Sequence, residues 1–317
     1  MQGYLRRRRN LTATQLEGTA MRRLYRVLVF AAVVAVALSQ AVADQRADDV
    51  AACYARGDAL NGQEKPDAAI AEFNKALALD PSCAEAYNGR GLSYFTKGDV
   101  DRALADLDKA TTLKPDYAEA YYDRAVVYES KNDWDCTEAD LKQAIALKPD
   151  HARAYNSYGL MYLAMADRAR AAGNEDETTG DLDRAIPKFD KAIALMPDYA
   201  EAWSDRGSAY DHKGDFDSAI TNFDKAITLK PDNGQTYNSR GVVYLEKGDY
   251  NRAIADFDKA LALVPKLGEA FSNRACAWYF KGNYDRAWED VKRFRELHGT
   301  PDAAFLDALQ KASGRSE

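Results

Sequence analysis

A 34-residue unit repeats along most of this 317-residue chain. Its clearest copy is residues 234–267, GQTYNSRGVVYLEKGDYNRAIADFDKALALVPKL, and other copies follow at the same interval, except that the fourth runs longer. The copies begin at Val50, Ala84, Ala118, Ala152, Ala200, Gly234 and Gly268. A fixed period of this length predicts stacked units, each buried only against its neighbours, in one elongated domain rather than around a central core.

Each unit has the pattern of two antiparallel helices. Within a unit numbered 1 to 34, positions 4, 7, 8 and 11 share one face of a first helix, and positions 20, 24 and 27 share one face of a second. In residues 234–267, Gly248 suits a left-handed turn, Asp249 can cap the second helix and Pro265 ends it. Residues whose positions sum to about 31 face each other in such a hairpin, so Gly241 is predicted to pack on Phe257.

This pattern resembles the tetratricopeptide repeat, which has a large aromatic residue at position 4, Gly or Ala at 8, Tyr at 11, Ala at 20, an aromatic at 24, Ala at 27 and Pro at 32. The resemblance covers residues 50–299 and implies an all-α fold, a right-handed α-solenoid of about seven helix-turn-helix repeats. The predicted repeats are 50–83, 84–117, 118–151, 152–199, 200–233, 234–267 and 268–299. Residues 300–317 are predicted to form a capping helix and tail over the exposed end of the stack.

Position 7 departs from the family pattern, in which it is usually Leu. Here it is mostly Arg, and position 23, which faces it, is mostly acidic. The pairs are Arg56 with Glu72, Arg90 with Asp106, Arg124 with Asp140, Arg240 with Asp256 and Arg274 with Asp290. Arg206 faces a neutral Asn222, and repeat four replaces both members, with Tyr158 and Lys188. We predict that each Arg forms a partly buried ion pair within its own repeat or with a neighbouring one, which sets the angle between helices.

Residues 1–43 have the pattern of a secretory signal peptide. Arg22, Arg23 and Arg26 precede an apolar run over 27–38, and Ala41-Val42-Ala43 predicts cleavage after Ala43. Met21 is an alternative start, and residues 44–49 are predicted to be a short linker. If the apolar run is extended to Ala43, it is just long enough to form a membrane-spanning helix. The alternative to a cleaved signal peptide is therefore a membrane anchor over residues 27–43. The sequence therefore predicts an exported protein of the bacterial envelope, periplasmic or secreted.

The charge and the motif content exclude several classes of function. The chain has a net charge of −7, and residues 1–43 contribute +6, so the remainder carries −13. It offers no dense basic stripe for nucleic acid or anionic lipid. His151, His212 and His298 occupy unrelated repeat positions, and the chain has no phosphate loop, nucleophile elbow or dinucleotide fingerprint. We therefore expect a non-enzymatic protein without a metal or a cofactor.

Export would permit disulfide bonds among the four cysteines. Cys53 and Cys83 occupy positions 4 and 34 of repeat one, which lie at the same end of a hairpin, and we hypothesise that they pair. Cys136 and Cys276 lie in distant repeats and are interpreted as packing residues.

Repeat four contains 14 extra residues, Ala166–Thr179, at the tip of its hairpin. One interpretation is that each helix gains seven residues, which would lengthen the hairpin by about 10 Å. The alternative is a disordered acidic loop over Asn174–Thr179.

The family resemblance implies a concave groove lined by the first helices, which binds extended or helical peptide segments of other proteins through positions 2, 5, 9, 12 and 13. The candidate groove residues are Asn88, Leu92, Phe95, Tyr122, Val126, Glu129, Asn156, Leu160, Leu163, Ser204, Asp211, Asn238, Val242, Leu245, Ser272 and Tyr279. Asn at position 5 can bond a peptide backbone through both its donor and its acceptor. The alternative is that this position only needs a small polar side chain at a helix surface.

Three hypotheses follow. The preferred one is an exported adaptor that binds a peptide segment of another protein in the groove. The second is a regulatory or assembly subunit that acts through the repeat-four insertion. The third is a cell-wall polymer-binding protein that uses Phe95, Tyr122 and Tyr279 as stacking platforms.

Overall fold

The computed structural model describes residues 13–315 and contains helices but no strand in that range. Residues 1–12 of the predicted signal peptide and residues 316–317 of the predicted tail therefore lie outside the described residues. The chain divides into two compact units, 1–115 and 116–317. The all-α repeat fold predicted from the 34-residue period is confirmed.

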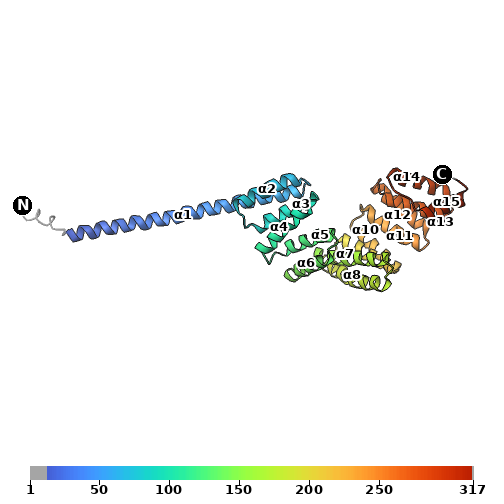
Figure 1. Cartoon of the computed structure of the whole chain (residues 1–317), viewed down its shortest axis with the longest axis horizontal. Helices are drawn as coiled ribbons and strands as arrows, with labels where there is room; N and C mark the ends of the chain where they lie inside the picture. The colour runs from blue at the N-terminus through green and yellow to red at the C-terminus, as the bar shows by residue number, and fades with distance from the viewer. Residues whose placement is uncertain (1–12, 316–317) are drawn as a thin grey trace, which may run out of the picture. The chain divides into compact units, whose positions relative to one another are not determined.

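Unit 1 contains two helical hairpins (Figure 1). Its helices are α1 (Ala13–Asn61), α2 (Pro66–Leu79), α3 (Ala84–Thr96) and α4 (Val100–Leu113). The first helix of repeat one is the end of α1, which extends far beyond the hairpin that it forms with α2. Residues 44–49, which were predicted to be a short linker, are helical and continue α1. No Gly or Pro interrupts residues 27–56, so nothing in the sequence stops the helix there.

Unit 2 contains five further hairpins and a terminal helix. Its helices are α5 (Ala118–Ser130), α6 (Trp134–Leu147), α7 (Ala152–Ala171), α8 (Glu175–Leu195), α9 (Ala200–His212), α10 (Phe216–Leu229), α11 (Gly234–Glu246), α12 (Tyr250–Leu263), α13 (Gly268–Phe280), α14 (Tyr284–Glu296) and α15 (Ala303–Ser313). Each odd-numbered helix from α5 to α13 begins a repeat, and the following even-numbered helix completes it.

The turn between the two helices of a repeat contains a residue with a positive φ at position 15, except in repeat four, where the insertion moves the turn to Gly173. Gly248 has a φ of 75°, and Asn132, which replaces Gly in repeat three, has a φ of 56°. Asp249 then caps α12 because its carboxylate accepts a hydrogen bond from the backbone N–H of Arg252 at 3.1 Å.

Glycine at position 8 lets the two helices of a repeat pack closely. The ring of Phe257 is completely buried, and a Cβ atom placed on Gly241 would lie 2.6 Å from its Cε1 atom. Gly159 and Gly207 meet Phe189 and Phe223 in the same way. The predicted pairing of positions 8 and 24 is confirmed, and each buried Phe contributes about 1.5–3 kcal/mol of transfer free energy.

The position-7 arginines form the predicted ion pairs and an additional contact that the sequence did not indicate. Arg240 donates through Nε and Nη2 to Asp256 of its own repeat at 2.8 and 2.7 Å. Its Nη1 also donates to Asp224, at position 25 of the preceding repeat. Arg274 repeats this arrangement with Asp290 and Asp258. One guanidinium therefore joins the second helices of two consecutive repeats.

Repeat four replaces this ion pair with a different contact. The ammonium of Lys188 lies 4.3 Å from the ring centroid of Tyr158, and the hydroxyl of Tyr158 donates to Glu138 of repeat three at 2.6 Å. A cation–π contact and a hydrogen bond from a neutral hydroxyl to a carboxylate thus occupy the site of the missing arginine.

The repeat-four insertion is helical. α7 and α8 have 20 and 21 residues, against 13 and 14 in the other complete repeats of unit 2, so each helix gains seven. The turn contains Gly173, with a φ of 73°, and Asn174 caps α8 through the backbone N–H of Glu177 at 3.2 Å. Ala166 and Ala169 are buried in the extension, whereas residues 170–177 are exposed. The extended-hairpin interpretation is therefore correct.

The helix α15 covers the last repeat. Its Leu309 is completely buried against a cluster that includes Ala275, Ala287 and Val291. A hydrophobic surface that would otherwise face water at the end of the stack is thereby covered.

Candidate interaction groove

The first helices of the last three repeats of unit 2 enclose a polar pocket of about 420 Å³. Four of the predicted groove residues line it: Asp211, Asn238, Val242 and Ser272. Its wall also contains Ser208, His212, Gln235, Ser239, Glu269, Asn273 and Phe294, which the prediction did not include. The lining comes from α9, α11 and α13, with one residue from α14, so the pocket crosses three consecutive repeats.

The remaining predicted groove residues of unit 2 also lie on first helices, but outside this pocket. They are Tyr122, Val126, Glu129, Asn156, Leu160, Leu163, Ser204, Leu245 and Tyr279. Asn156 and Leu163 are buried, and the others are half-buried. In unit 1, α3 carries Asn88, which is buried, and Leu92 and Phe95, which are half-buried.

Asparagine at position 5 is more buried than a peptide-contacting residue needs to be. Asn156 and Asn238 are 3% and 4% exposed. The amide nitrogen of Asn156 donates to Asp205 Oδ2 at 2.8 Å, and Asn238 Oδ1 accepts from Asn273 Nδ2 at 3.2 Å. Asp205 and Asn273 both occupy position 6 of the following repeat. These amides therefore connect neighbouring first helices, so only part of their bonding capacity remains for a ligand.

Acidic groups dominate the electrostatics of the first helices of unit 2. Burial, with a smaller contribution from the nearby Asp205 carboxylate, raises the pKa of Glu129 to about 6. Burial also raises the pKa of Asp205 to about 6, against the lowering effect of its hydrogen bond from Asn156. Burial raises the pKa of Asp211 to about 6, and the negative charge of Glu246 contributes to this rise. Each group is costly to ionise because no cation compensates its desolvation fully.

Two of the three aromatic side chains proposed as stacking platforms, Tyr122 and Tyr279, are in contact with protein groups. The ring of Tyr122 lies 4.9 Å from that of His151, with the guanidinium of Arg153 at 5.4 Å. The ring of Tyr279 contacts Phe280, Tyr284 and Phe305 at 5.3 to 5.9 Å. These contacts favour peptide binding over the polymer-binding alternative, which needs accessible ring faces.

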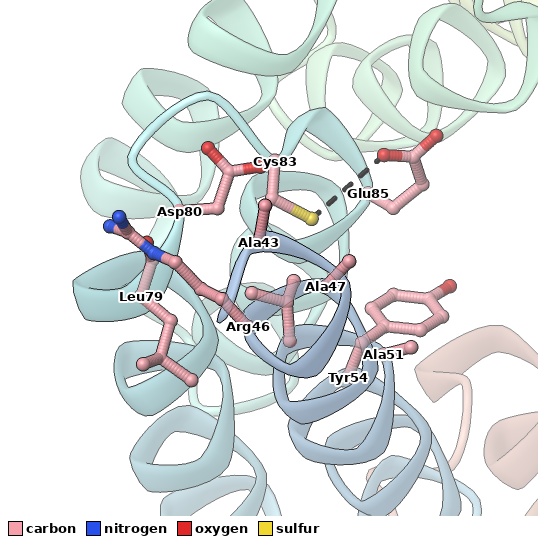
Figure 2. Close-up of a pocket in the computed structure, with 10 residues that line it drawn as sticks. Ala43, Arg46, Ala47, Ala51, Tyr54, Leu79, Asp80, Cys83 and Glu85 are labelled. Carbon is pink, nitrogen blue, oxygen red and sulfur yellow. Dashed lines mark hydrogen bonds between the residues drawn. The ribbon is translucent and has the colours of Figure 1, made fainter. Parts of the chain in front are cut away.

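A second pocket, which the sequence did not predict, lies in unit 1 and measures about 560 Å³. Figure 2 shows the small side chains of Ala43, Ala47 and Ala51 on α1 facing the segment that joins α2 to α3. The guanidinium of Arg46 donates to the backbone oxygen of Leu79 at 2.5 Å across this space. The spacing of three alanines four residues apart was the signal in the sequence for a thin strip on one helix face.

Cys83 also lines the unit 1 pocket, and its thiol contacts Glu85 Oε2 at 3.9 Å (Figure 2). Cys53 is buried and its sulfur accepts from Arg56 at 3.1 Å. All four cysteines are free thiols in the structure. The predicted bond between Cys53 and Cys83 is therefore not formed here, and it stays a prediction for the oxidised protein. Among residues 13–315, no group of three His, Cys, Asp or Glu side chains is arranged to hold a metal ion.

Comparison with known families agrees with this architecture. A tetratricopeptide repeat model matches residues 35–82, 54–118, 89–135 and 170–234, and a second model of the same repeat matches residues 234–267. The chain therefore belongs to the tetratricopeptide repeat family, whose fold serves as a scaffold for interactions between proteins. No curated protein matched the sequence.

Solved structures show the same fold at low sequence identity. A chain of the APC/C hetero-tetramer Cut9–Hcn1 is 17% identical to this chain, with a TM-score of 0.66. The match covers 80% of this chain and 47% of the Cut9–Hcn1 chain, so this chain spans about half the length of that relative. A tetratricopeptide repeat protein from Parabacteroides merdae is 16% identical with a TM-score of 0.59, over 84% and 100%. PilW, described as a type IV pilus biogenesis factor, is 19% identical with a TM-score of 0.59, over 73% and 98%.

Proposed function

We propose that this protein is an exported, non-enzymatic adaptor that binds a peptide segment of another protein along the first helices of unit 2. The observation that carries the proposal is the pocket of about 420 Å³ across α9, α11 and α13. Half-buried Val242 offers an apolar contact, while Gln235, Ser239 and Asn273 offer hydrogen-bonding groups for a peptide backbone. Sites that recognise extended peptides use hydrogen bonds to the peptide main chain for affinity and side-chain pockets for specificity.

Site-specific photo-crosslinking in the native cell tests this proposal. A photoreactive residue at Ser239 lies in the pocket, and one at exposed Ala255 on α12 serves as the control. We expect Ser239 to capture a protein that Ala255 does not, and we expect Val242→Arg to abolish the capture. Equal capture from both positions, or capture that survives Val242→Arg, would contradict binding in the groove.

The repeat-four insertion supports a second candidate function, an assembly subunit that binds through this projection. Residues 170–177 are exposed on a rigid two-helix extension rather than on a loop. A photoreactive residue at Ala171 of the full-length chain would identify a partner at this position. Deletion of residues 166–179 is tested separately, in the chain that carries the probe at Ser239. If the capture from Ser239 is lost on that deletion while Val242→Arg has no effect, the second function is the correct one.

Export of the chain is part of the proposal. The segment Leu28–Asn61 is long and apolar enough to cross a membrane, none of its apolar window is buried, and it lies near the N-terminus. A signal peptide and a membrane anchor both meet these criteria. Cleavage after Ala43 would leave Arg46 and its bond to Leu79 intact.

The processed N-terminus of the protein from its native cell distinguishes the two forms. A mature chain beginning at Asp44 in the soluble envelope fraction is expected for a signal peptide. A chain that retains residues 27–43 in the membrane fraction would instead establish the anchor. A cytoplasmic protein with an intact N-terminus would contradict export.

A further inference from the structure

Two carboxylates and one amide oxygen gather on the first helices of unit 2 without a cation. They are Glu129 on α5, Asn156 on α7 and Asp205 on α9, and we name them the acidic notch. Asn156 is 3% exposed, and its Oδ1 atom is buried and has no hydrogen-bond partner among the described residues. Its amide nitrogen is bound to Asp205, which places the unpartnered oxygen beside that carboxylate. An unpaired buried acceptor costs about 1–3 kcal/mol, so this position favours an additional donor.

Several other carboxylates of the repeats are compensated by a cation. Asp140 and Asp256 each accept two bonds from an arginine at 2.7 to 2.8 Å. Glu119 and Glu201, at position 2 of their repeats, contact Lys148 and Lys230. In contrast, neither Glu129 nor Asp205 forms an ion pair within residues 13–315.

One cation close to the notch, Arg153, is already bound. Arg153 contacts Glu119 at 3.7 Å and lies over the ring of Tyr122, and its side chain is 58% exposed. Tyr122 is half-buried beside Glu129, and Tyr199 is half-buried beside Asp205. Two phenol rings therefore accompany the carboxylates, and such rings are favourable neighbours for the alkyl stem and the charged head of a basic side chain.

The notch and the groove described above share the helix α9. Asp205 and Ser208 lie one helical turn apart on this helix, and Ser208 lines the pocket. At positions 2, 6, 9, 12 and 13 the first helices of unit 2 carry eight acidic residues and one arginine. A ligand that follows these helices therefore meets a negative surface with its most buried acceptors at the notch.

We propose that the acidic notch binds an arginine or lysine side chain of the peptide that occupies the groove. This inference rests on the proposed function, and it names the chemistry of the partner: a cationic segment rather than an acidic or C-terminal carboxylate motif. The guanidinium or ammonium donates to Asp205, to Glu129 and to the unpartnered Asn156 Oδ1. The bound cation also compensates both carboxylates, whose ionised forms desolvation disfavours.

Selection from a displayed library of random dodecapeptides, with the full chain held in detergent micelles, tests this inference. Asp205→Asn combined with Glu129→Gln removes both charges and keeps the side-chain shapes, including the acceptor for Asn156. Glu175→Gln combined with Asp176→Asn removes the same charge from the exposed insertion and serves as the matched control. Thermal unfolding of each variant, followed by circular dichroism, shows whether the fold is retained.

We expect the wild type and the control to select peptides that carry Arg or Lys at one fixed position. The notch variant should bind these selected peptides at least tenfold more weakly. Replacing that arginine by neutral citrulline should weaken binding to the wild type to the same extent and have little effect on the notch variant. Selected peptides without a basic residue, or equal affinity for the notch variant, would overturn the notch assignment and leave groove binding intact. Selection of no peptide at all would overturn both.

Discussion

Replacing Arg240 by methionine tests whether the position-7 arginines hold successive repeats together. The guanidinium donates twice to Asp256, which is 6% exposed, and once to Asp224, whose side chain is 53% exposed. Methionine keeps much of the apolar contact of the arginine stem but removes every donor. The Asp256 carboxylate would then be buried without a counter-charge.

The structure also supplies a natural comparison in the preceding repeat. Arg206 donates to neutral Asn222 at 2.8 Å and to half-exposed Asp190 at 2.5 Å. Loss of Arg240 should cost about 3–5 kcal/mol because it isolates a buried charge. Loss of Arg206 should cost about 1–3 kcal/mol because it isolates an amide. The Arg240→Met variant is therefore expected to be less stable than Arg206→Met by about 2 kcal/mol.

Urea unfolding monitored by circular dichroism at pH 7.5 would measure this difference. Adding Asp256→Asn to Arg240→Met removes the isolated charge and should recover more than half of the lost free energy of unfolding. The reasoning would be refuted if Arg206→Met were as destabilising as Arg240→Met, or if Asp256→Asn gave no recovery. Either result would mean that the arginine acts through its alkyl stem rather than its charge.

Three further outcomes are expected. First, burial raises the pKa of Asp205 from 3.8 to about 6 in the folded protein. The unfolded chain therefore loses this proton at a lower pH than the folded protein, and the stability of the wild type falls as the pH rises from about 4 to 6. Asp205→Asn should remove the part of this fall that Asp205 causes and stabilise the protein by about 2–3 kcal/mol at pH 7.5, measured as urea midpoints at pH 4 and 7.5; an equal pH dependence in wild type and variant would contradict it. Gly241→Ala should destabilise by about 1–3 kcal/mol because its Cβ would overlap the ring of Phe257, whereas Gly180→Ala, which has open space, should stabilise by about 0.5–1 kcal/mol. Similar thermal midpoints for the two glycine variants would argue against close packing at position 8. Deletion of residues 166–179 should leave a cooperatively unfolding helical protein because it restores a 34-residue repeat, and loss of cooperativity in circular dichroism would show that the extension stabilises its neighbours.

Contacts within one repeat were predictable from the sequence. The period determines which residues of the two helices face each other, so Gly241 with Phe257 and Arg240 with Asp256 follow from positions that sum to about 31. The repeat-four insertion was ambiguous because helix formers and an acidic turn allowed two interpretations. In the structure the segment is helical. Ala166 and Ala169 are buried within the extended hairpin, and this burial stabilises the helices relative to a loop.

Contacts between repeats were not predictable in the same way. Arg240 reaches Asp224, and Asn156 reaches Asp205, only because of the rotation and offset between successive hairpins. No residue within a single repeat specifies that offset, which results from the packing of all the facing side chains together. The pocket across α9, α11 and α13 depends on the same geometry, so the sequence named four of its residues and missed the others.

The sequence by itself therefore determined the repeating two-helix unit, its internal packing and the acidic character of the first helices. These properties are local, and a 34-residue period repeats them. Tertiary structure alone decided which polar groups of neighbouring repeats meet, and which carboxylates remain without a cation. The physical reason is that the pairing of a buried charge depends on distances of a few ångströms between helices, and those distances exist only once the repeats are stacked.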